Sequence, residues 1–224
     1  MHKFILAALS FVLALAAAAN EPVRSVRLWE NGPAFADRNI GAEQPWGSGS
    51  YFWWGDARGY RMSNGVWMAS DGSTSGFSFK EGTCPSRGKY RQVLQQEGWI
   101  TADGLSPKCD AASVLWGTEW RIPTVSELSD LVAKCDWRWE STNGVFGCRV
   151  SGRGKYAAAS IFLPAAGDAC SERLDDSGSL GFYWSSEPYP GSMNYAWHLL
   201  FSNGGQYMSN GNRDDGYSIR PVRD

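Results

Sequence analysis

The sequence predicts one α+β domain of short strands, tight turns and one or two helices. Aromatic residues are abundant, with 12 Trp, 9 Tyr and 10 Phe, and 26 Gly separate them along the 224 residues. Aromatic side chains favour strands and glycine favours turns, whereas only one segment has a strong helical pattern. The hydrophobic fraction of 43% is enough for a sizeable core.

That helical segment is expected over about residues 125–134. Thr124 and Glu127 have the spacing of a capping box, in which each side chain binds the other residue's backbone N–H. One apolar stripe follows, made of Leu128, Leu131, Val132 and Cys135. A shorter helix is expected over 110–116, ended by Gly117.

The other expected elements are short strands. Before the helices they lie at 26–29, 51–54 and 65–68, and after them at 161–164, 183–186, 195–202, 206–209 and 217–222. Residues 71–109 are expected to form a surface excursion and 210–216 a polar loop. In 195–202 the bulkier alternate set, Tyr195, Trp197, Leu199 and Phe201, is expected to face the core.

The first 19 residues have the pattern of a secretory signal peptide. Lys3 precedes an apolar run that ends in Ala16–Ala19, and small residues at 17 and 19 suit cleavage after Ala19. An uncleaved membrane anchor is the alternative, although the run is short for a span. We therefore expect an exported protein, in the periplasm, at the cell surface or secreted, with its domain over residues 20–224 and no membrane span after cleavage.

Export would allow the five cysteines to form disulfides. Cys135 and Cys148 flank a predicted hairpin with the turn signal Thr142-Asn143-Gly144, and a bridge between them would close it. Cys84 and Cys109 flank a polar stretch, so these are the two expected pairs, with Cys170 left over. The sequence cannot fix the pairing, and it has no CxxC spacing for zinc or redox chemistry.

Charge and histidine content exclude several function classes. The formal net charge of −2 gives no basic field for a phosphate backbone, so nucleic-acid binding is not expected. The two histidines are His2, inside the predicted signal peptide, and His198. One remaining histidine cannot build a multi-histidine metal site, and the chain has no GxSxG motif to accompany a catalytic His198.

Several motifs in their order along the chain resemble the Fibrobacter succinogenes major paralogous domain family over about residues 25–224. The motifs are Trp120–Thr124, Ser160–Gly167, Tyr183–Ser186 and Gly216–Arg223, with Ala36–Ala42 and Tyr51–Asp56 upstream. The resemblance implies a C-type-lectin-like fold, related to formylglycine-generating enzymes and to the variable proteins of diversity-generating retroelements. In such variable proteins a C-terminal window is hypermutated, and here the corresponding window is Glu187–Asp215.

The window is rich in residue types that suit a binding surface, because Tyr gives contact area at low entropic cost and Asn, Ser and Arg give adaptable hydrogen bonds. The candidate ligand-binding residues are Glu187, Tyr189, Asn194, His198, Leu200, Ser202, Asn203, Tyr207, Asn210, Asn212, Arg213, Asp214 and Asp215. The alternative is that they are ordinary turn residues. Among the tryptophans, Trp120, Trp184 and Trp197 are expected in the core, and Trp53, Trp54, Trp137 and Trp139 at the surface.

No cofactor is expected. The calcium loop of sugar-binding C-type lectins is not matched, because Tyr189 follows Glu187-Pro188 and His198 follows Trp197. The copper-binding cysteines of formylglycine-generating enzymes have no counterpart after Cys170. The sequence thus predicts an exported, non-enzymatic protein that presents residues 187–215 to a protein or glycan on a cell, phage or host surface. A structural cell-surface component without a specific ligand is the alternative, and a degenerate formylglycine-type enzyme a further one.

Overall fold

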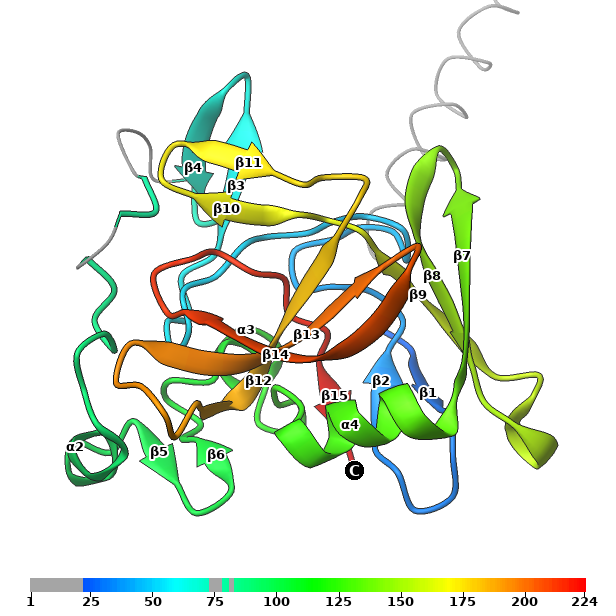
Figure 1. Cartoon of the computed structure of the whole chain (residues 1–224), viewed down its shortest axis with the longest axis horizontal. Coiled ribbons are helices and arrows are strands. Elements are labelled where there is room, and N and C mark those ends of the chain that lie inside the picture. Colours follow the sequence, from blue (N-terminus) through cyan, green and yellow to red (C-terminus); the bar gives the residue numbers. More distant parts are fainter. Residues whose placement is uncertain (1–21, 73–77, 81–82) are drawn as a thin grey trace, which may run out of the picture.

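The chain folds mostly into strands arranged in small antiparallel sheets (Figure 1). This computed structural model describes residues 22–72, 78–80 and 83–224, so the predicted signal peptide lies outside it. The few helices among these strands confirm the α+β class. Over the described ranges, no helix is both long and apolar enough to cross a membrane.

Each sheet has two or three strands. The three-stranded sheets contain β1 (Ser25–Arg27), β2 (Ala34–Ala36) and β15 (Val222–Arg223); β7 (Asp136–Thr142), β8 (Val145–Ser151) and β9 (Ser160–Pro164); and β12 (Gly181–Pro188), β13 (Tyr195–Ser202) and β14 (Gly205–Asn212). The two-stranded sheets contain β3 (Tyr60–Ser63) and β4 (Val66–Ala69); β5 (Ile100–Thr101) and β6 (Gly104–Leu105); and β10 (Asp168–Cys170) and β11 (Arg173–Asp175).

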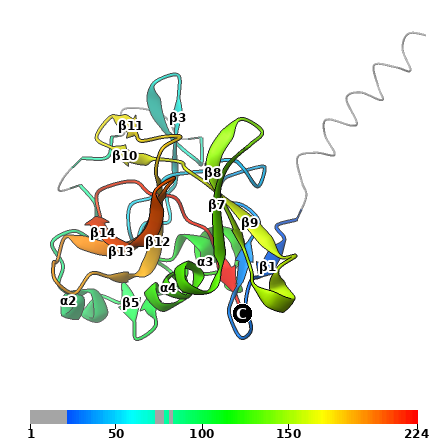
Figure 2. The same cartoon turned by 45° about the vertical axis from the view of Figure 1, so that its right-hand side comes forward.

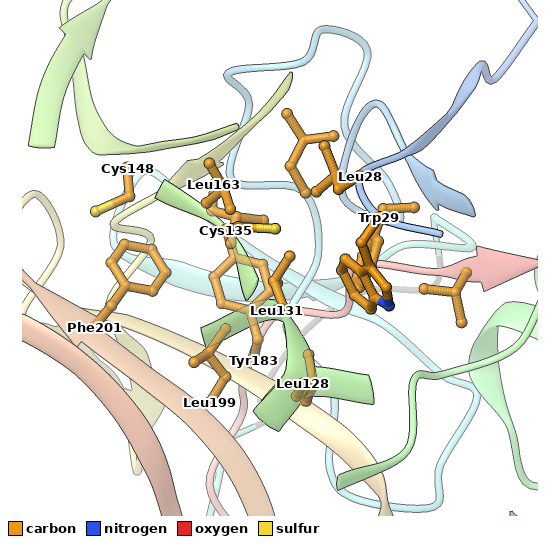
Figure 3. Packing of buried hydrophobic residues seen from close by; sticks show 14 of the residues in the cluster. Leu28, Trp29, Leu128, Leu131, Cys135, Cys148, Leu163, Tyr183, Leu199 and Phe201 are labelled. Carbon is orange, nitrogen blue, oxygen red and sulfur yellow. The ribbon is translucent and has the colours of Figure 1, made fainter. Parts of the chain in front are cut away.

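Helix α4 (Val125–Lys134) confirms the predicted helix. The Thr124 hydroxyl accepts from the Glu127 N–H at 3.2 Å, and the Glu127 carboxylate accepts from the Thr124 N–H at 2.8 Å, so both halves of the capping box are present. Its stripe packs Leu128 and Leu131 into a core that also contains residues of β8, β9, β12 and β13 (Figure 3). Figure 2 shows the β12–β14 and β7–β9 sheets side by side, with α4 at their lower edge.

Strands β7 and β8 form the predicted hairpin, but the predicted disulfide across it is wrong. Asn143 and Gly144 both have positive φ, 50° and 81°, which the two-residue turn of a twisted hairpin requires. Cys148 pairs in register with Trp139, four residues beyond Cys135, so the two thiols are not opposite each other. All five cysteines are free thiols, including Cys84 and Cys109 of the second predicted pair.

Strand β13 matches its predicted bounds but is buried on both faces. Its first half buries Ala196 and His198, and its second half buries Leu199 and Phe201, which lie on the opposite face. The prediction that Tyr195, Trp197, Leu199 and Phe201 all face the core is therefore wrong for the first two. Tyr195 is exposed and Trp197 is half-buried, because α4 covers only the far end of this face.

Residues 71–109 do more than form a surface excursion. They contain helix α2 (Arg91–Gln96), and β5 and β6 follow it. Leu94, Ile100 and Leu105 are buried in a second core. Helix α3 (Ala111–Trp116) follows, as expected, with the Asp110 carboxylate capping its N-terminus.

The predicted surface positions of Trp53 and Trp54 are wrong, because both side chains are buried. The indole N–H groups of these residues donate to the carbonyls of Asp214 and Ser185, at 2.7 and 2.9 Å. Trp120 and Trp184 are buried as expected, and Trp137 and Trp139 are half-buried. The adjacent tryptophans both turn inward because the extended segment there passes between two cores.

The C-terminal segment is bound to the N-terminal one by a buried arginine. Arg220 donates to the Asn39 side chain at 2.9 Å and to the carbonyls of Ala36 and Phe162 at 3.1 and 2.8 Å. Burial lowers its pKa to about 10. Of the strand predicted over 217–222, only Val222 lies in a strand, β15, while Tyr217 and Ser218 pair by single bridges with Phe52 and Tyr183.

Candidate functional site

The window 187–215 consists of the end of β12, a loop, the β13–β14 hairpin and the segment that follows it. Strand β14 extends to Asn212, three residues further than predicted, so Asn210–Asn212 are strand residues and not part of a loop. Register pairs Trp197 with Asn210 and Tyr195 with Asn212. Side chains of paired residues share a face of the sheet, so these four lie on one face.

Three predicted binding residues are buried and face protein, which corrects their assignment as surface residues. They are His198, Arg213 and Asp214, with exposed fractions of 2%, 1% and 4%.

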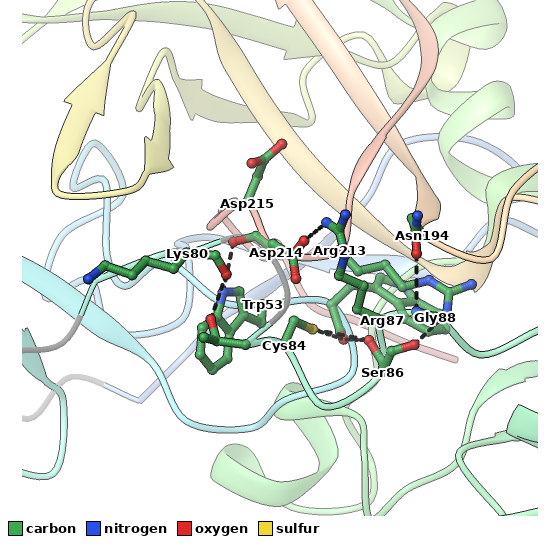
Figure 4. A network of polar contacts seen from close by, with 12 residues as sticks. Trp53, Lys80, Cys84, Ser86, Arg87, Gly88, Asn194, Arg213, Asp214 and Asp215 are labelled. Atoms are coloured by element: carbon green, nitrogen blue, oxygen red, sulfur yellow. Dashed lines mark hydrogen bonds and ion pairs between the residues drawn. The ribbon is translucent and has the colours of Figure 1, made fainter.

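Arg213 anchors the end of the hairpin to residues 84–90 (Figure 4). Its guanidinium donates to the carbonyls of Ser86 at 2.7 Å, Lys89 at 3.1 Å and Tyr195 at 3.1 Å. The same group lies 4.8 Å from the ring centroid of Trp54. Burial lowers the pKa of Arg213 to about 10, and the carbonyls and the aromatic face stabilise the charge in place of water.

His198 lies in an aromatic cluster. Its ring centroid is 4.9 Å from Tyr217, 5.7 Å from Phe182 and 5.9 Å from Trp184. Neither ring nitrogen has a hydrogen-bond partner among the described residues. Burial lowers its pKa to about 3, so the imidazole is neutral at pH 7.

Two further predicted residues make structural hydrogen bonds. The Glu187 carboxylate accepts from the Val125 N–H at 3.0 Å, at the first residue of α4. The Asn194 side-chain oxygen accepts from the Gly88 N–H at 3.1 Å, next to the segment that Arg213 binds. Both side chains therefore position neighbouring segments.

The remaining predicted residues are divided between the two faces of the hairpin. Leu200 pairs with Tyr207, and Ser202 lies on the same face. Tyr207 and Asn203 are exposed, and Leu200 and Ser202 are half-buried. Asn210 and Asn212 lie on the opposite face, so the thirteen residues do not form one surface.

We use the term open face for five residues at the Asn212 end of the hairpin: Tyr189, Tyr195, Trp197, Asn210 and Asn212. Trp197 meets Tyr189 edge to face, with ring centroids 4.9 Å apart. Tyr195 is exposed and the other four are half-buried. The open face therefore combines aromatic rings with amide groups.

A hollow of about 360 Å³ lies beside the open face and shares two residues with it. Tyr195, Asn212, Asp214 and Asp215 line it from the window, and Phe79, Arg87, Cys170 and Ser171 line it from elsewhere. Sequence reasoning missed these last four and Tyr195. Phe79, Arg87, Cys170 and Ser171 lie outside the window in sequence. Tyr195 lies inside it, but its alternation with Trp197 predicts a core position.

The hollow is acidic. Arg87 forms an ion pair with Asp214, which leaves Asp215 as the further charge of the lining. Burial raises the pKa of Asp215, and its carboxylate accepts from the Tyr217 hydroxyl at 3.2 Å. Nearby, burial and then the charges of Asp215, Asp176 and Asp175 raise the pKa of Asp168 to about 6.

Several carboxylates lie in and near the hollow, among them Asp214, Asp215 and Asp168. Among the residues that the structure describes, no group of three or more His, Cys, Asp or Glu side chains is placed to hold a metal ion.

Comparison with known proteins identifies the family. Neither the curated proteins nor the solved structures give a match. The profile of the Lcl C-terminal domain matches residues 60–223, which is well over half of the chain and includes the hairpin, the open face and the whole lining of the hollow. The chain therefore belongs to the Lcl C-terminal domain family, the Fibrobacter major paralogous domain family.

Proposed function

We propose that this chain is an exported, non-enzymatic protein that binds a protein or glycan through the open face. The observation that carries the proposal is the combination of exposed or half-exposed Tyr, Trp and Asn side chains on one face of a hairpin. Aromatic rings supply contact area with few rotatable bonds, and amides supply hydrogen bonds that adapt to a ligand. We also propose the C-type-lectin-like fold, which the pairing of β1, β2 and β15 supports.

Residues outside the open face anchor both ends of the hairpin. Arg213 binds three backbone carbonyls below the open face, and Leu199 and Phe201 pack under α4 at the other end. A surface fixed in this way loses little conformational entropy when a ligand binds.

Binding can be tested with two probes, a printed glycan array and a phage-displayed random peptide library. The wild-type chain is compared with the double variant Tyr189→Ser/Asn210→Ala. Tyr207→Ser is the matched control, because Tyr207 lies on the same hairpin but on the opposite face and is 56% exposed. We expect a saturable hit that the double variant loses and Tyr207→Ser keeps.

Two outcomes would overturn this assignment. Absence of any saturable hit would favour a structural cell-surface component. Loss of binding in Tyr207→Ser but not in the double variant would place the binding surface on the opposite face.

We further propose that the window 187–215 is diversified, as the family resemblance implies, with variation restricted by burial. Sequencing of the gene's 3′ end across a natural population tests this. Substitutions are expected at the codons of half-buried residues such as 189, 210 and 212. The codons of the buried residues 199, 201 and 213 are expected to be invariant. An invariant window would contradict diversification and leave a single fixed partner.

A further inference from the structure

The hollow beside the open face contains a buried hydrogen-bond acceptor to which no described residue donates. Asp214 is 4% exposed, and its Oδ1 atom has no hydrogen-bond donor among the described residues. Its other carboxylate oxygen pairs with Arg87. A buried carboxylate oxygen without a donor is energetically unfavourable, so this position favours a ligand that donates to it.

The charge of the lining defines the ligand further. Arg87 and Asp214 compensate each other, and Asp215 adds a second carboxylate; in Figure 4, Asp214 points toward Arg87, whereas Asp215 points away from this ion pair. Asp168 adds acidic charge nearby, because it interacts electrostatically with Asp215. An anionic ligand would meet this charge unfavourably, whereas a cation would be attracted to it.

The neighbouring groups suit an organic cation. Tyr195 contributes an exposed aromatic ring, which attracts a cation at its face, and Asn212 contributes an amide. A guanidinium or an alkylammonium group can donate hydrogen bonds to carboxylate oxygens while its apolar stem contacts an aromatic ring. The volume of about 360 Å³ is at the small end of ligand sites, which suits one side chain better than a large ligand.

We propose that this hollow binds a guanidinium or alkylammonium group, with Asp214 Oδ1 and Asp215 as acceptors. The inference rests on the proposed ligand-binding function and specifies part of its ligand, a basic side chain of a peptide or a small organic amine. The open face would contact the rest of the ligand through Tyr195 and Asn212, which it shares with the hollow.

Calorimetric titration with capped peptides tests the proposal. The probes are acetyl-Gly-Arg-Gly-amide, acetyl-Gly-Lys-Gly-amide and the citrulline version of the first, which keeps its shape but not its charge. Agmatine is the small-molecule arm. We expect at least one of the cationic probes to bind about tenfold more tightly than the citrulline peptide. Tighter binding of a peptide than of agmatine would identify a polypeptide as the source of the cation.

Variants assign the site. Asp215→Asn should weaken binding of the cationic probe about tenfold, whereas Asp103→Asn should leave it unchanged. Asp103 is the matched control because it is exposed in the β5–β6 turn and its substitution removes the same charge. Asp214→Asn should weaken binding at least as much, and its thermal melt shows whether the variant folds.

Equal binding of the cationic and citrulline peptides would overturn the proposal, as would equal effects of Asp215→Asn and Asp103→Asn. Such a failure is distinguishable from failure of the proposed function. If the array or library hit still depends on Tyr189 and Asn210, the open face binds its ligand and only the assignment of the hollow is wrong.

Discussion

The two ends of the β13–β14 hairpin are stabilised in different ways. At the turn end, Leu199 and Phe201 are fully buried beneath α4 in an apolar core. At the other end, Tyr195 is exposed and Trp197 half-buried on the same face, and Arg213 and the buried Ala196 hold the strand on its other side. The turn end is therefore an apolar packing site, and the open end is a polar anchor that leaves one face accessible.

This difference separates folding from recognition within one short segment. Residues that face α4 or contact Arg213 determine the stability of the hairpin, whereas residues of the open face contribute little to it. Substitutions at the two ends should consequently differ in their effect on unfolding.

The largest effect is expected at the turn end. Phe201 packs against Tyr183 and Trp137, with ring centroids 5.8 and 5.7 Å apart. Phe201→Ala removes this packing and leaves a cavity, so it should lower the free energy of unfolding by about 3–5 kcal/mol. Urea denaturation measures this value. A loss below about 1 kcal/mol would show that apolar packing does not stabilise this end.

The second-largest effect on the free energy of unfolding is expected at the polar anchor, Arg213. Arg213→Met keeps the aliphatic stem but leaves the carbonyls of Ser86 and Lys89 without this donor, and it removes the charge over Trp54. We expect a loss of about 2–4 kcal/mol in the same urea experiment. If the free energy of unfolding were unchanged, Arg213 would not anchor the open end. The proposed difference between the two ends would then be wrong.

His198 should make stability depend on pH. Its pKa is about 3 in the folded protein and near the ordinary 6.5 in the unfolded chain. Below pH 6.5 the unfolded state therefore binds a proton that the folded state does not, and the stability contribution falls by about 1.4 kcal/mol for each pH unit.

In His198→Leu this proton uptake is absent. The drop in the free energy of unfolding between pH 7 and pH 5 should be about 2 kcal/mol smaller than in the wild type. At pH 7 the substitution should be close to neutral, because it removes a buried imidazole without hydrogen-bond partners. Parallel pH profiles for the two proteins would contradict a buried, neutral His198.

The smallest effect is expected on the open face. Asn210 is half-buried, and Asn210→Ala should change the free energy of unfolding by no more than about 0.5 kcal/mol. Arg213 lies only three residues further along the chain, so the losses in unfolding free energy of Asn210→Ala and Arg213→Met can be compared directly. A loss comparable to that of Arg213→Met would mean that the open face is part of the fold.

Local signals in the sequence predicted much of the fold. The capping box at Thr124 and Glu127 and the apolar stripe after it gave helix α4, and the Asn143-Gly144 turn gave the β7–β8 hairpin. The alternation over 195–202 gave the bounds of β13. Each signal depends on residues a few positions apart, which is why sequence reasoning could find it.

Other features depend on contacts between distant segments, and the sequence did not predict them. Arg213 looks like a surface residue until the segment 84–90 supplies carbonyls for it, and Trp53 becomes buried only when Asp214 accepts from its indole. The expected pairing of Cys135 with Cys148 assumed that flanking a turn places two residues opposite each other, whereas register places Trp139 opposite Cys148. The candidate hollow is lined by residues of β10, β13 and β14 together with Phe79 and Arg87, so no single stretch indicates it.

The most direct test of the separation between folding and recognition is a saturation substitution scan of residues 187–215, displayed on cells and selected for resistance to protease. We predict that Tyr189, Asn210 and Asn212 accept most residue types, while Leu199, Phe201 and Arg213 accept few. Equal tolerance at both groups, or intolerance on the open face, would contradict the account.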